Sequence, residues 1–180
     1  MTEGLANDSV SHEPATTSKQ DLTPSHLVTA LQREHPEWIM EVIEAFGEVT
    51  AIVPREHIVA VCSFLKGSPD SKFDFLADLC AADRGPEEEP RFEVNYHLFS
   101  TTSYHRLRLK VLLNEGNVHV PTVNGVWRTA NWHERETYDL VGIVFDGHPD
   151  LRRILLPDDW HGHALRKDFP LRGYEPYSLK

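Results

Sequence analysis

The sequence contains few cysteines, and they form no metal-binding motif. Of its 180 residues only Cys62 and Cys80 are cysteine, and no CxxC pair occurs. Paired thiolates ligate structural zinc and iron–sulfur clusters, so the sequence offers no cysteine frame for either. Both cysteines stand among apolar neighbours, in VCSFL and DLCAA. This context predicts two buried free thiols in a protein of a reducing compartment.

Long apolar runs and the common catalytic motifs are missing as well. No stretch of about 18 apolar residues is present, so no transmembrane helix is predicted. The polar N-terminal segment has neither the basic start nor the apolar centre of a secretory signal. GxxxxGK[ST], GxGxxG and GxSxG do not occur. The sequence therefore gives no support to a nucleotide-binding domain or a serine hydrolase.

The net charge of −10 is spread unevenly along the chain. Residues 1–90 hold 6 Lys/Arg and 17 Asp/Glu, whereas residues 91–131 hold 5 and 2. Residues 132–180 hold 7 and 9, densely mixed. An acidic chain is a poor partner for nucleic acid. Alternating charge of both signs in the last segment favours a specific protein interface.

The composition divides the chain into three parts. Residues 1–22 are polar and poor in large apolar side chains, which predicts a disordered tail. Residues 23–146 carry the periodic patterns of an α+β domain, with an antiparallel or mixed sheet and helices on one face. Residues 147–180 have neither helical nor strand periodicity, and they are rich in Pro, Gly and aromatic residues. We expect this last part to be a long irregular C-terminal arm.

Within the central part, apolar spacing and turn residues predict the individual elements. Helices are expected over residues 24–35, 36–46 (with Gly47 as C-cap) and 54–67, a strand over 48–54, and an antiparallel hairpin of strands 91–101 and 105–113. The stretch FDFLADLCAAD fits a strand and a helix equally well. A last helix is expected from Asn131, the N-cap, to Gly142, with Glu134 completing a capping box.

The arm raises the question of a metal or catalytic site. His148, His161 and His163 suggest a His-based metal site, but no further donors at fixed spacing join them. The motif HExxH fails because Thr137 stands where its second histidine belongs. Glu134 and Glu136, two apart on a helix, point in nearly opposite directions and cannot share a substrate.

A protein interface is the other reading of the arm. Arg side chains pair with carboxylates and carbonyls in fixed geometry, and Trp and Phe are the large anchors of interfaces. The residue types fit an arm that lies on a partner protein, but also an arm that folds back on its own domain. Residue chemistry alone leaves both open.

The stretch ERETYDLVGIVFDGHPDLRRILLPDDWHGHALRKDFPL, residues 134–171, resembles the signature of the 30-kDa subunit family of respiratory complex I. Upstream, VPREH, RFEVNYHLFS and RLRLKV are also similar to this family. Val141 stands where the family usually has an aromatic residue, and Ala164 where it has proline. Both departures change packing more than identity.

The resemblance implies a cofactor-free scaffold subunit of an NADH:quinone oxidoreductase, of the kind known in bacterial enzymes as the C-type subunit. Such enzymes pass electrons from NADH through FMN and iron–sulfur clusters to quinone, coupled to ion translocation. The flavin, clusters and quinone are then held by other subunits, and no catalytic residue is expected here. The resemblance places the chain in the peripheral arm of the enzyme, on the cytoplasmic side of the inner membrane. Its partners there would be the quinone-pocket (D-type) subunit and the iron–sulfur subunits, with membrane association only through the complex. A related subunit of a membrane-bound hydrogenase fits the same signature.

The partner-interface residues that this reading predicts come from the last helix and the arm. They are Trp132, Glu134, Arg135, Glu136, Asp139, His148, Arg152, Arg153, Pro157, Asp158, Asp159, Trp160, His163, Arg166, Lys167 and Asp168.

Overall fold

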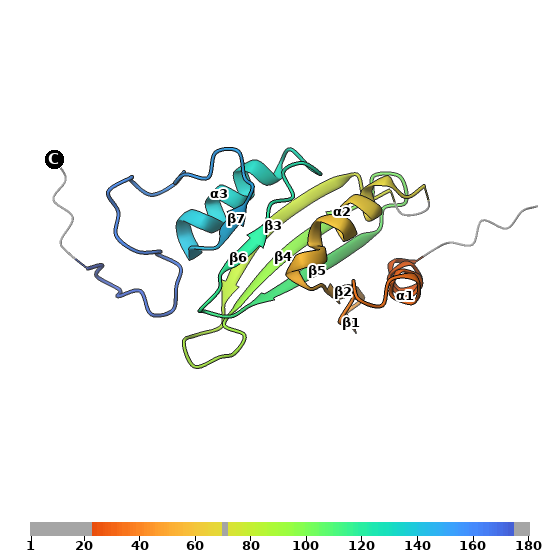
Figure 1. Ribbon diagram of the computed structural model, residues 1–180, viewed down its shortest axis with the longest axis horizontal. Helices are drawn as coiled ribbons and strands as arrows, with labels where there is room; N and C mark the ends of the chain where they lie inside the picture. The colour runs from red at the N-terminus through yellow and green to blue at the C-terminus, as the bar shows by residue number, and fades with distance from the viewer. Residues whose placement is uncertain (1–22, 70–71, 175–180) are drawn as a thin grey trace, which may run out of the picture.

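The computed structural model describes residues 23–69 and 72–174, so the tail expected at residues 1–22 lies outside the described residues. It is an α+β fold, as predicted (Figure 1). The elements are, in chain order, α1 (Pro24–Glu34), β1 (Glu41–Ala45), β2 (Glu48–Ile52), η1 (Arg55–His57), α2 (Ile58–Gly67), β3 (Phe75–Asp83), β4 (Phe92–Phe99), β5 (Arg106–Leu113), β6 (His119–Pro121), α3 (Ala130–Val141) and β7 (Val144–Asp146).

The main sheet is mixed and has the strand order β1-β2-β5-β4-β3. Strands β2 and β5 run parallel, and the other neighbours run antiparallel. The hairpin predicted from alternation is confirmed as β4 and β5, paired from Phe92 opposite Leu113 to Phe99 opposite Arg106. Strands β6 and β7 form a separate parallel pair beside α3. A mixed sheet with helices packed on it confirms the predicted fold class.

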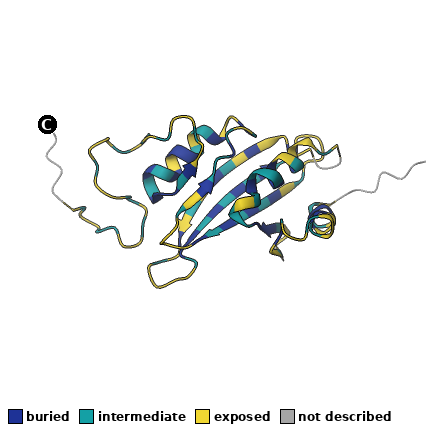
Figure 2. Ribbon diagram, viewed as in Figure 1, coloured by how far each residue is buried: buried dark blue, intermediate teal, exposed yellow. Residues whose placement is uncertain are grey.

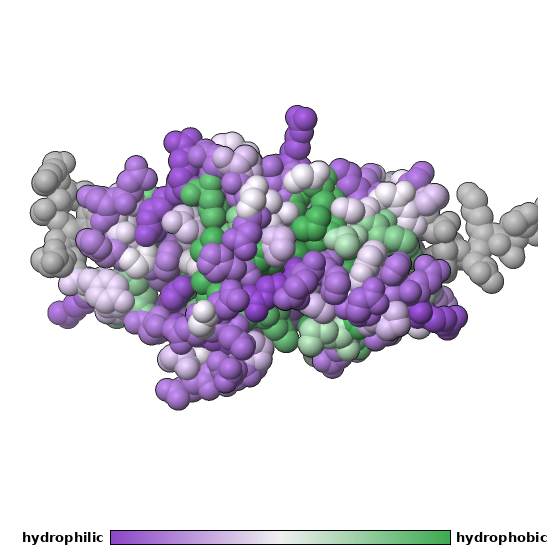
Figure 3. Space-filling view, viewed as in Figure 1, coloured by the Kyte–Doolittle hydropathy of each residue, from purple (hydrophilic) through white to green (hydrophobic). Residues whose placement is uncertain are grey.

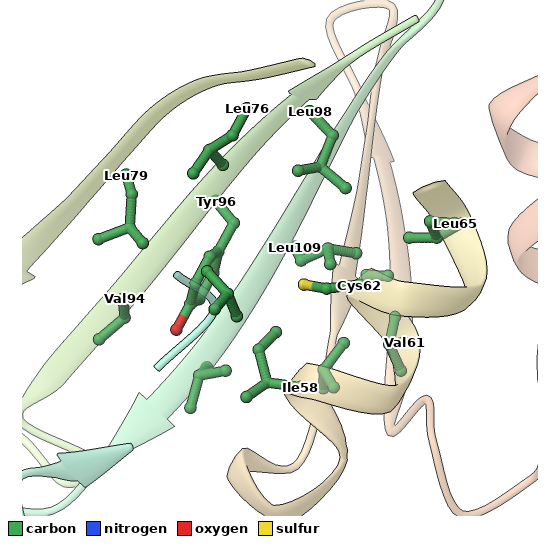
Figure 4. Close-up of a cluster of buried hydrophobic side chains, with 14 of the residues drawn as sticks. Ile58, Val61, Cys62, Leu65, Leu76, Leu79, Val94, Tyr96, Leu98 and Leu109 are labelled. Atoms are coloured by element: carbon green, nitrogen blue, oxygen red, sulfur yellow. The ribbon is translucent and has the colours of Figure 1, made fainter. Parts of the chain in front are cut away.

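Burial alternates along β4, so the sheet has a buried inner face and a less buried outer face (Figure 2). On the inner face, Ile58, Cys62 and Leu65 of α2 point toward the sheet, where Tyr96 and Leu109 lie (Figure 4). The outer face carries ion pairs, such as Lys110 with Glu93 at 2.7 Å. Burial of the inner side chains is the main stabilising contribution to the domain.

The helix predicted over residues 36–46 is wrong. Residues 41–52 form the β1–β2 hairpin, with Ala45 opposite Glu48. The two turn residues, Phe46 and Gly47, have φ values of 55° and 78°. Positive φ at both central positions is the geometry of a type I′ turn, which matches the twist of the flanking strands. The β-branched residues of β1 also favour a strand, and the Phe46 side chain lies fully in solvent instead of on a helix face.

The ambiguous stretch at residues 73–83 contains strand β3, and a β-bulge explains why its period was unclear. Leu76 pairs with Leu98 and Asp78 with His97, so Ala77 is an extra residue. The bulge lets Leu76 and Leu79, three apart, both face the core. Cys80 then lies on the outer face and is exposed, so the prediction of a buried thiol is wrong for Cys80. It is confirmed for Cys62, whose pKa is raised by burial.

Helix α3 is where predicted, but the capping box at its start is wrong. Its N-cap is Thr129, with no side-chain capping bond, so Asn131 already lies in the first turn. Glu134 points inward and accepts hydrogen bonds from the Val123 backbone N–H at 2.8 Å and the Thr122 hydroxyl at 2.5 Å. The Asn-x-x-Glu spacing was matched by chance, because the tertiary fold gives this glutamate a different partner. No helix among the described residues is long and apolar enough to cross a membrane.

Candidate partner interface

The carboxylate of Asp139 holds one part of the arm, which follows β7, against α3. Residues 147–174 contain no helix or strand and run in a wide loop beside α3 (Figure 1). One oxygen of Asp139 accepts the backbone N–H groups of Ile154, Leu155 and Leu156 at 2.8–3.0 Å. Its other oxygen accepts from the Arg153 guanidinium at 2.7 Å. Three successive donors on one carboxylate fix the backbone path of the arm at this point.

Electrostatics at Asp139 favour its ionised form. Burial of the carboxyl group raises its pKa, but the hydrogen bonds from the Leu156 N–H, the Arg153 side chain and the neighbouring N–H groups lower it by more. The net result is a pKa below the ordinary range. The buried negative charge is therefore stable, and it needs the arm to remain so.

The arm also caps the C-terminal end of α3. The last carbonyl groups of a helix lack partners inside it. Here His163 Nδ1 lies 2.9 Å from the backbone carbonyl oxygen of Asp139. The Leu165 N–H donates to the carbonyl oxygen of Leu140, and Arg166 Nε donates to that of Val141 at 2.7 Å. Cationic Arg166 at this end also complements the helix dipole.

Gly142 makes this close packing possible. It ends the helix in the left-handed region, with φ of 84°. A Cβ at this position would lie 2.5 Å from the His163 ring and 2.7 Å from the Arg166 guanidinium. The glycine is therefore required both by the backbone turn and by the approach of the arm.

Arg135 and Arg153 join the middle of the arm to α3. Arg135 is buried and donates to the backbone oxygens of Arg152 and Arg153 at 3.2 and 3.1 Å. Arg153 also donates to the carbonyl of Trp160 at 3.0 Å. The Trp160 ring stacks on Phe169, which closes a small aromatic cluster inside the arm.

A second attachment links the arm to the sheet. Arg91, directly before β4, is 1% exposed and donates two hydrogen bonds to the Asp83 carboxylate, at 2.9 and 2.8 Å. Asp168 of the arm lies 3.0 Å from the same guanidinium, and the Lys167 N–H donates to Asp83 at 2.8 Å. A hydrogen bond from Arg91 lowers the pKa of Asp83 against the opposing effect of burial. Because Arg91 and Asp83 are buried together, removal of either one would leave the charge of the other uncompensated.

His148 connects the beginning of the arm to the first turn of α3. Its Nδ1 accepts the Asp150 N–H at 3.0 Å, so Nε2 carries the proton toward the Asn131 oxygen at 3.2 Å. The same Nε2 lies 3.9 Å from Glu134, and both side chains are fully buried. Burial raises the pKa of Glu134 to about 7, although its hydrogen bonds from Thr122 and Val123 oppose the shift.

The residues predicted for a partner interface thus separate into two groups. Those that point into this chain, or bond the arm to it, are Glu134, Arg135, Asp139, His148, Arg153, Trp160, His163, Arg166 and Asp168. Those with exposed side chains are Trp132, Glu136, Arg152, Pro157, Asp158, Asp159 and Lys167. The first group supports the reading in which the arm folds back on its own domain.

The exposed group is accompanied by apolar side chains, a pattern that favours binding of another protein. Trp132, Leu155, Leu165 and Tyr174 are each about 60% exposed, and Leu171 is fully so. In Figure 3 the visible surface is mostly hydrophilic, with separate hydrophobic spots. Arg135 lies 5.3 Å from the Trp132 ring and holds it in place at the surface. Exposed Trp and Leu in a frame of charged side chains is the composition of a docking surface.

The structure does not gather the histidines of the alternative metal site. His148 and His163 each bond to backbone groups of this chain, and His161 is exposed in the arm. Among the described residues, the donors that come close together are Asp78, Cys80 and His97 on the outer face of the sheet.

Sequence reasoning missed Asp83 and Arg91. Both flank the acidic loop RGPEEEP, and nothing in their spacing distinguishes a buried pair from solvated loop ends. The one available signal was the position of Arg91, an arginine directly before the alternating apolar residues of a strand.

The sequence and the fold were compared with those of known proteins. The family model described as respiratory-chain NADH dehydrogenase, 30 Kd subunit, matches residues 51–175. The chain is 56% identical to the second C-type subunit of the NADH-quinone oxidoreductases of Rhizobium meliloti (strain 1021) over 131 residues, which are 73% of this chain and 71% of that one. It is 50% identical to the C-type subunit of the NADH-quinone oxidoreductase of Geotalea uraniireducens (strain Rf4) over 152 residues, 83% of this chain and 91% of that one.

Solved structures agree in fold. A trypsin-resistant fragment of Nqo5 superposes with a TM-score of 0.60 and 33% identity, over 69% of this chain and 98% of the fragment. A chain of the membrane-bound sulfane sulfur reductase, an archaeal respiratory membrane complex, superposes with a TM-score of 0.66 over 82% of this chain and 85% of that one. At 21% identity, the second likeness concerns the fold alone.

Proposed function

The chain belongs to the family of the 30-kDa subunit of respiratory-chain NADH dehydrogenase, and we propose that it serves as a cofactor-free scaffold subunit in the peripheral arm of an NADH:quinone oxidoreductase. Its task is to bind neighbouring subunits and hold them in register. Electron transfer from NADH to quinone, with the associated ion translocation, is then carried out by the cofactors of those neighbours.

The observation that carries the proposal is the position of the family match. It spans residues 51–175, and so it includes most of the arm as well as strands β3, β4 and β5 of the main sheet. Among the described residues, the fully buried members of the apolar core run from Leu27 to Phe145, and the arm adds only the partly buried Leu151, which packs against this core. A segment that a family retains with so small a share in the core is best explained by a surface role. The exposed side chains of α3 and the arm supply that surface.

The partners that fit this surface are the quinone-pocket subunit and the iron–sulfur subunits of the same enzyme. Mixed charge around exposed Trp132 and Leu155 offers both electrostatic selection and apolar contact area. FMN, iron–sulfur clusters and quinone belong to those subunits in this proposal. The chain itself would lie on the cytoplasmic side of the inner membrane and be attached through the complex.

The test is assembly compared with turnover. Trp132→Ala and Arg152→Ala remove exposed groups from α3 and the arm, and each variant is co-expressed with the other subunits of the enzyme. Loss of one interface anchor typically costs about 2 kcal/mol or more, which is about 30-fold in affinity. We expect less of the variant chain in the assembled complex by size-exclusion chromatography, with unchanged NADH:quinone turnover per assembled complex.

The matched control is Tyr104→Ala. Tyr104 is 78% exposed and lies in the β4–β5 turn, at the end of the sheet opposite Arg91. The Tyr104→Ala variant should assemble into the complex normally. Normal assembly of the Trp132 and Arg152 variants with lost turnover would contradict the scaffold role, as would NADH oxidation by the purified chain alone.

A further inference from the structure

The bulge in β3 brings three metal-binding side chains to one place on the outer face of the sheet. Asp78 and Cys80 are two apart on β3 and therefore share a face. Asp78 is paired with His97 of β4, and Cys80 with the neighbouring Asn95. If the register of Phe75 and Leu76 continued without a bulge, Asp78 would be opposite Tyr96, whose side chain lies in the core. Bulges often re-aim side chains in this way beside functional sites.

The donor atoms are close enough to share one ion. The Asp78 carboxylate, the Cys80 sulfur and a ring nitrogen of His97 all lie within 4.8 Å of one another. Bond lengths of about 2.0–2.3 Å to a tetrahedral ion require donor separations of about 3.3–3.8 Å. Small rotations of three surface side chains close the difference, and the paired strands keep their Cα positions fixed.

Helix α3 brings a further donor next to one member of this group. His133 Nδ1 lies 3.4 Å from the Asp78 carboxylate. α3 packs against β3, so the donors come from three elements that are already in contact.

The electrostatic surroundings suit a cation in spite of one nearby arginine. Arg108 lies near His97, but its guanidinium is paired with Glu48. His97 also lines a small pocket together with Glu48, Ala77 and Arg108.

We propose that Asp78, Cys80, His97 and His133 form a binding site for a divalent ion of the zinc type. A thiolate, two imidazoles and a carboxylate are the ligand set that Zn²⁺ prefers, whereas Ca²⁺ and Mg²⁺ prefer oxygen ligands alone. On binding, the thiol gives its proton to solvent and the sulfur binds the ion as thiolate. The ion would tie β3, β4 and α3 together, independently of any role in an oxidoreductase.

The experiment titrates the full purified chain with Co²⁺ under reducing, chelator-free conditions. Co²⁺ replaces Zn²⁺ in tetrahedral sites and shows sulfur-to-cobalt charge-transfer absorption. We expect one equivalent to bind with this absorption, Zn²⁺ to displace it, and Zn²⁺ to raise the melting temperature of the chain.

Two variants and a control locate the site. Cys80→Ser should abolish the charge-transfer band, and His97→Ala should weaken Co²⁺ binding by about 100-fold or more, since even the loss of groups that only support a ligand costs up to about 100-fold. His161→Ala removes an exposed histidine of the arm and should bind as the unaltered chain does. Unfolding midpoints without metal show that both site variants are folded.

Three results would overturn the proposal. One is the absence of a sulfur-to-cobalt band in the unaltered chain at stoichiometric Co²⁺. Another is equal affinity in the Cys80 and His97 variants. The third is loss of binding in His161→Ala with retention in the sheet variants, which would move the site to the arm.

Discussion

At the scale of single residues, Glu134 shows how burial changes a carboxyl group. Its pKa, raised by burial to about 7 from the ordinary 4.5, means that the folded chain holds a proton that the unfolded chain has released. Between these two values the folded state binds more protons, so the free energy of unfolding falls as pH rises from about 4.5 to 7 and is level above. Folding at neutral pH therefore occurs in spite of this group.

Glu134→Gln should remove that pH dependence. The amide keeps an oxygen for the Val123 N–H, and it does not ionise. Relative to the unaltered chain, the variant should become more stable between about pH 5 and pH 8, by on the order of 2 kcal/mol. Urea unfolding across this range measures the difference. Glu136→Gln, on the exposed side of the same helix, is the control, and an equal trend in both variants would contradict the assignment.

Arg91 forms one strong ionic interaction, with Asp83, and one weak one, with Asp168. Asp83 and Arg91 are almost fully buried, whereas the Asp168 side chain is 47% exposed. Removing one member of a buried pair leaves an uncompensated charge, so Arg91→Met should destabilise the chain by about 3–5 kcal/mol. Asp168→Asn should cost less than about 1 kcal/mol. Equal losses in chemical denaturation would show that the arm, and not the fork with Asp83, dominates this site.

At the scale of the secondary-structure element, the C-terminal end of α3 is completed by residues more than twenty positions away. The Asp139 and Val141 carbonyls bond to His163 and Arg166, which would not be near them in an isolated helix. The stability of this helix end and the position of the arm are therefore coupled.

Gly142→Ala should disturb both the C-terminal end of α3 and the position of the arm. The alanine would be strained at a φ of 84°, and its Cβ would displace the His163 ring. We expect destabilisation on the order of 2 kcal/mol and faster amide hydrogen exchange at Leu155 and Leu165. Gly125→Ala is the matched control, because a Cβ there meets nothing within 4 Å. Unchanged exchange in the Gly142 variant would show that α3 and the arm are uncoupled.

At the scale of the whole molecule, the chain consists of a core domain and an arm attached to it mainly by polar contacts. The buried apolar residues of the described structure end at Phe145. Hydrogen bonds and ion pairs attach the arm, and they are made by Asp139, Arg135 and Arg91. Hydrophobic burial therefore stabilises the domain, and directional bonds position the arm.

A chain shortened to residues 1–146 should consequently keep the sheet. It loses the partners of Asp139 and one partner of Arg91, so its melting temperature should fall by several degrees, about 4–8 °C for each kcal/mol lost in a small domain. Circular dichroism and dispersed amide NMR signals check that the fold remains. A random-coil spectrum would show that the arm is part of the folding unit. Failure of the shortened chain to enter the complex would add support to the scaffold role.

Much of the fold and part of the site were predictable from local signals. The β4–β5 hairpin follows from strict alternation, and α2 from apolar residues at helical spacing before Gly67. The β1–β2 hairpin was missed because Trp38, Val42 and Ala45 also fit a helix face, and the Phe46–Gly47 turn lacks the usual Asn-Gly. The capping box was a local match that a tertiary contact of Glu134 overrode.

The sequence by itself determined the family, the α+β class, and the charged and aromatic residues of the arm, because composition and short-range periodicity are properties of neighbouring positions. Only the tertiary structure decided which of those residues face inward. It made Asp139 a partner of the arm backbone, left Trp132 at the surface, and brought Asp78, Cys80 and His97 together through one bulge. Such choices depend on contacts between distant segments, and a one-residue shift of strand register exchanges the inner and outer faces.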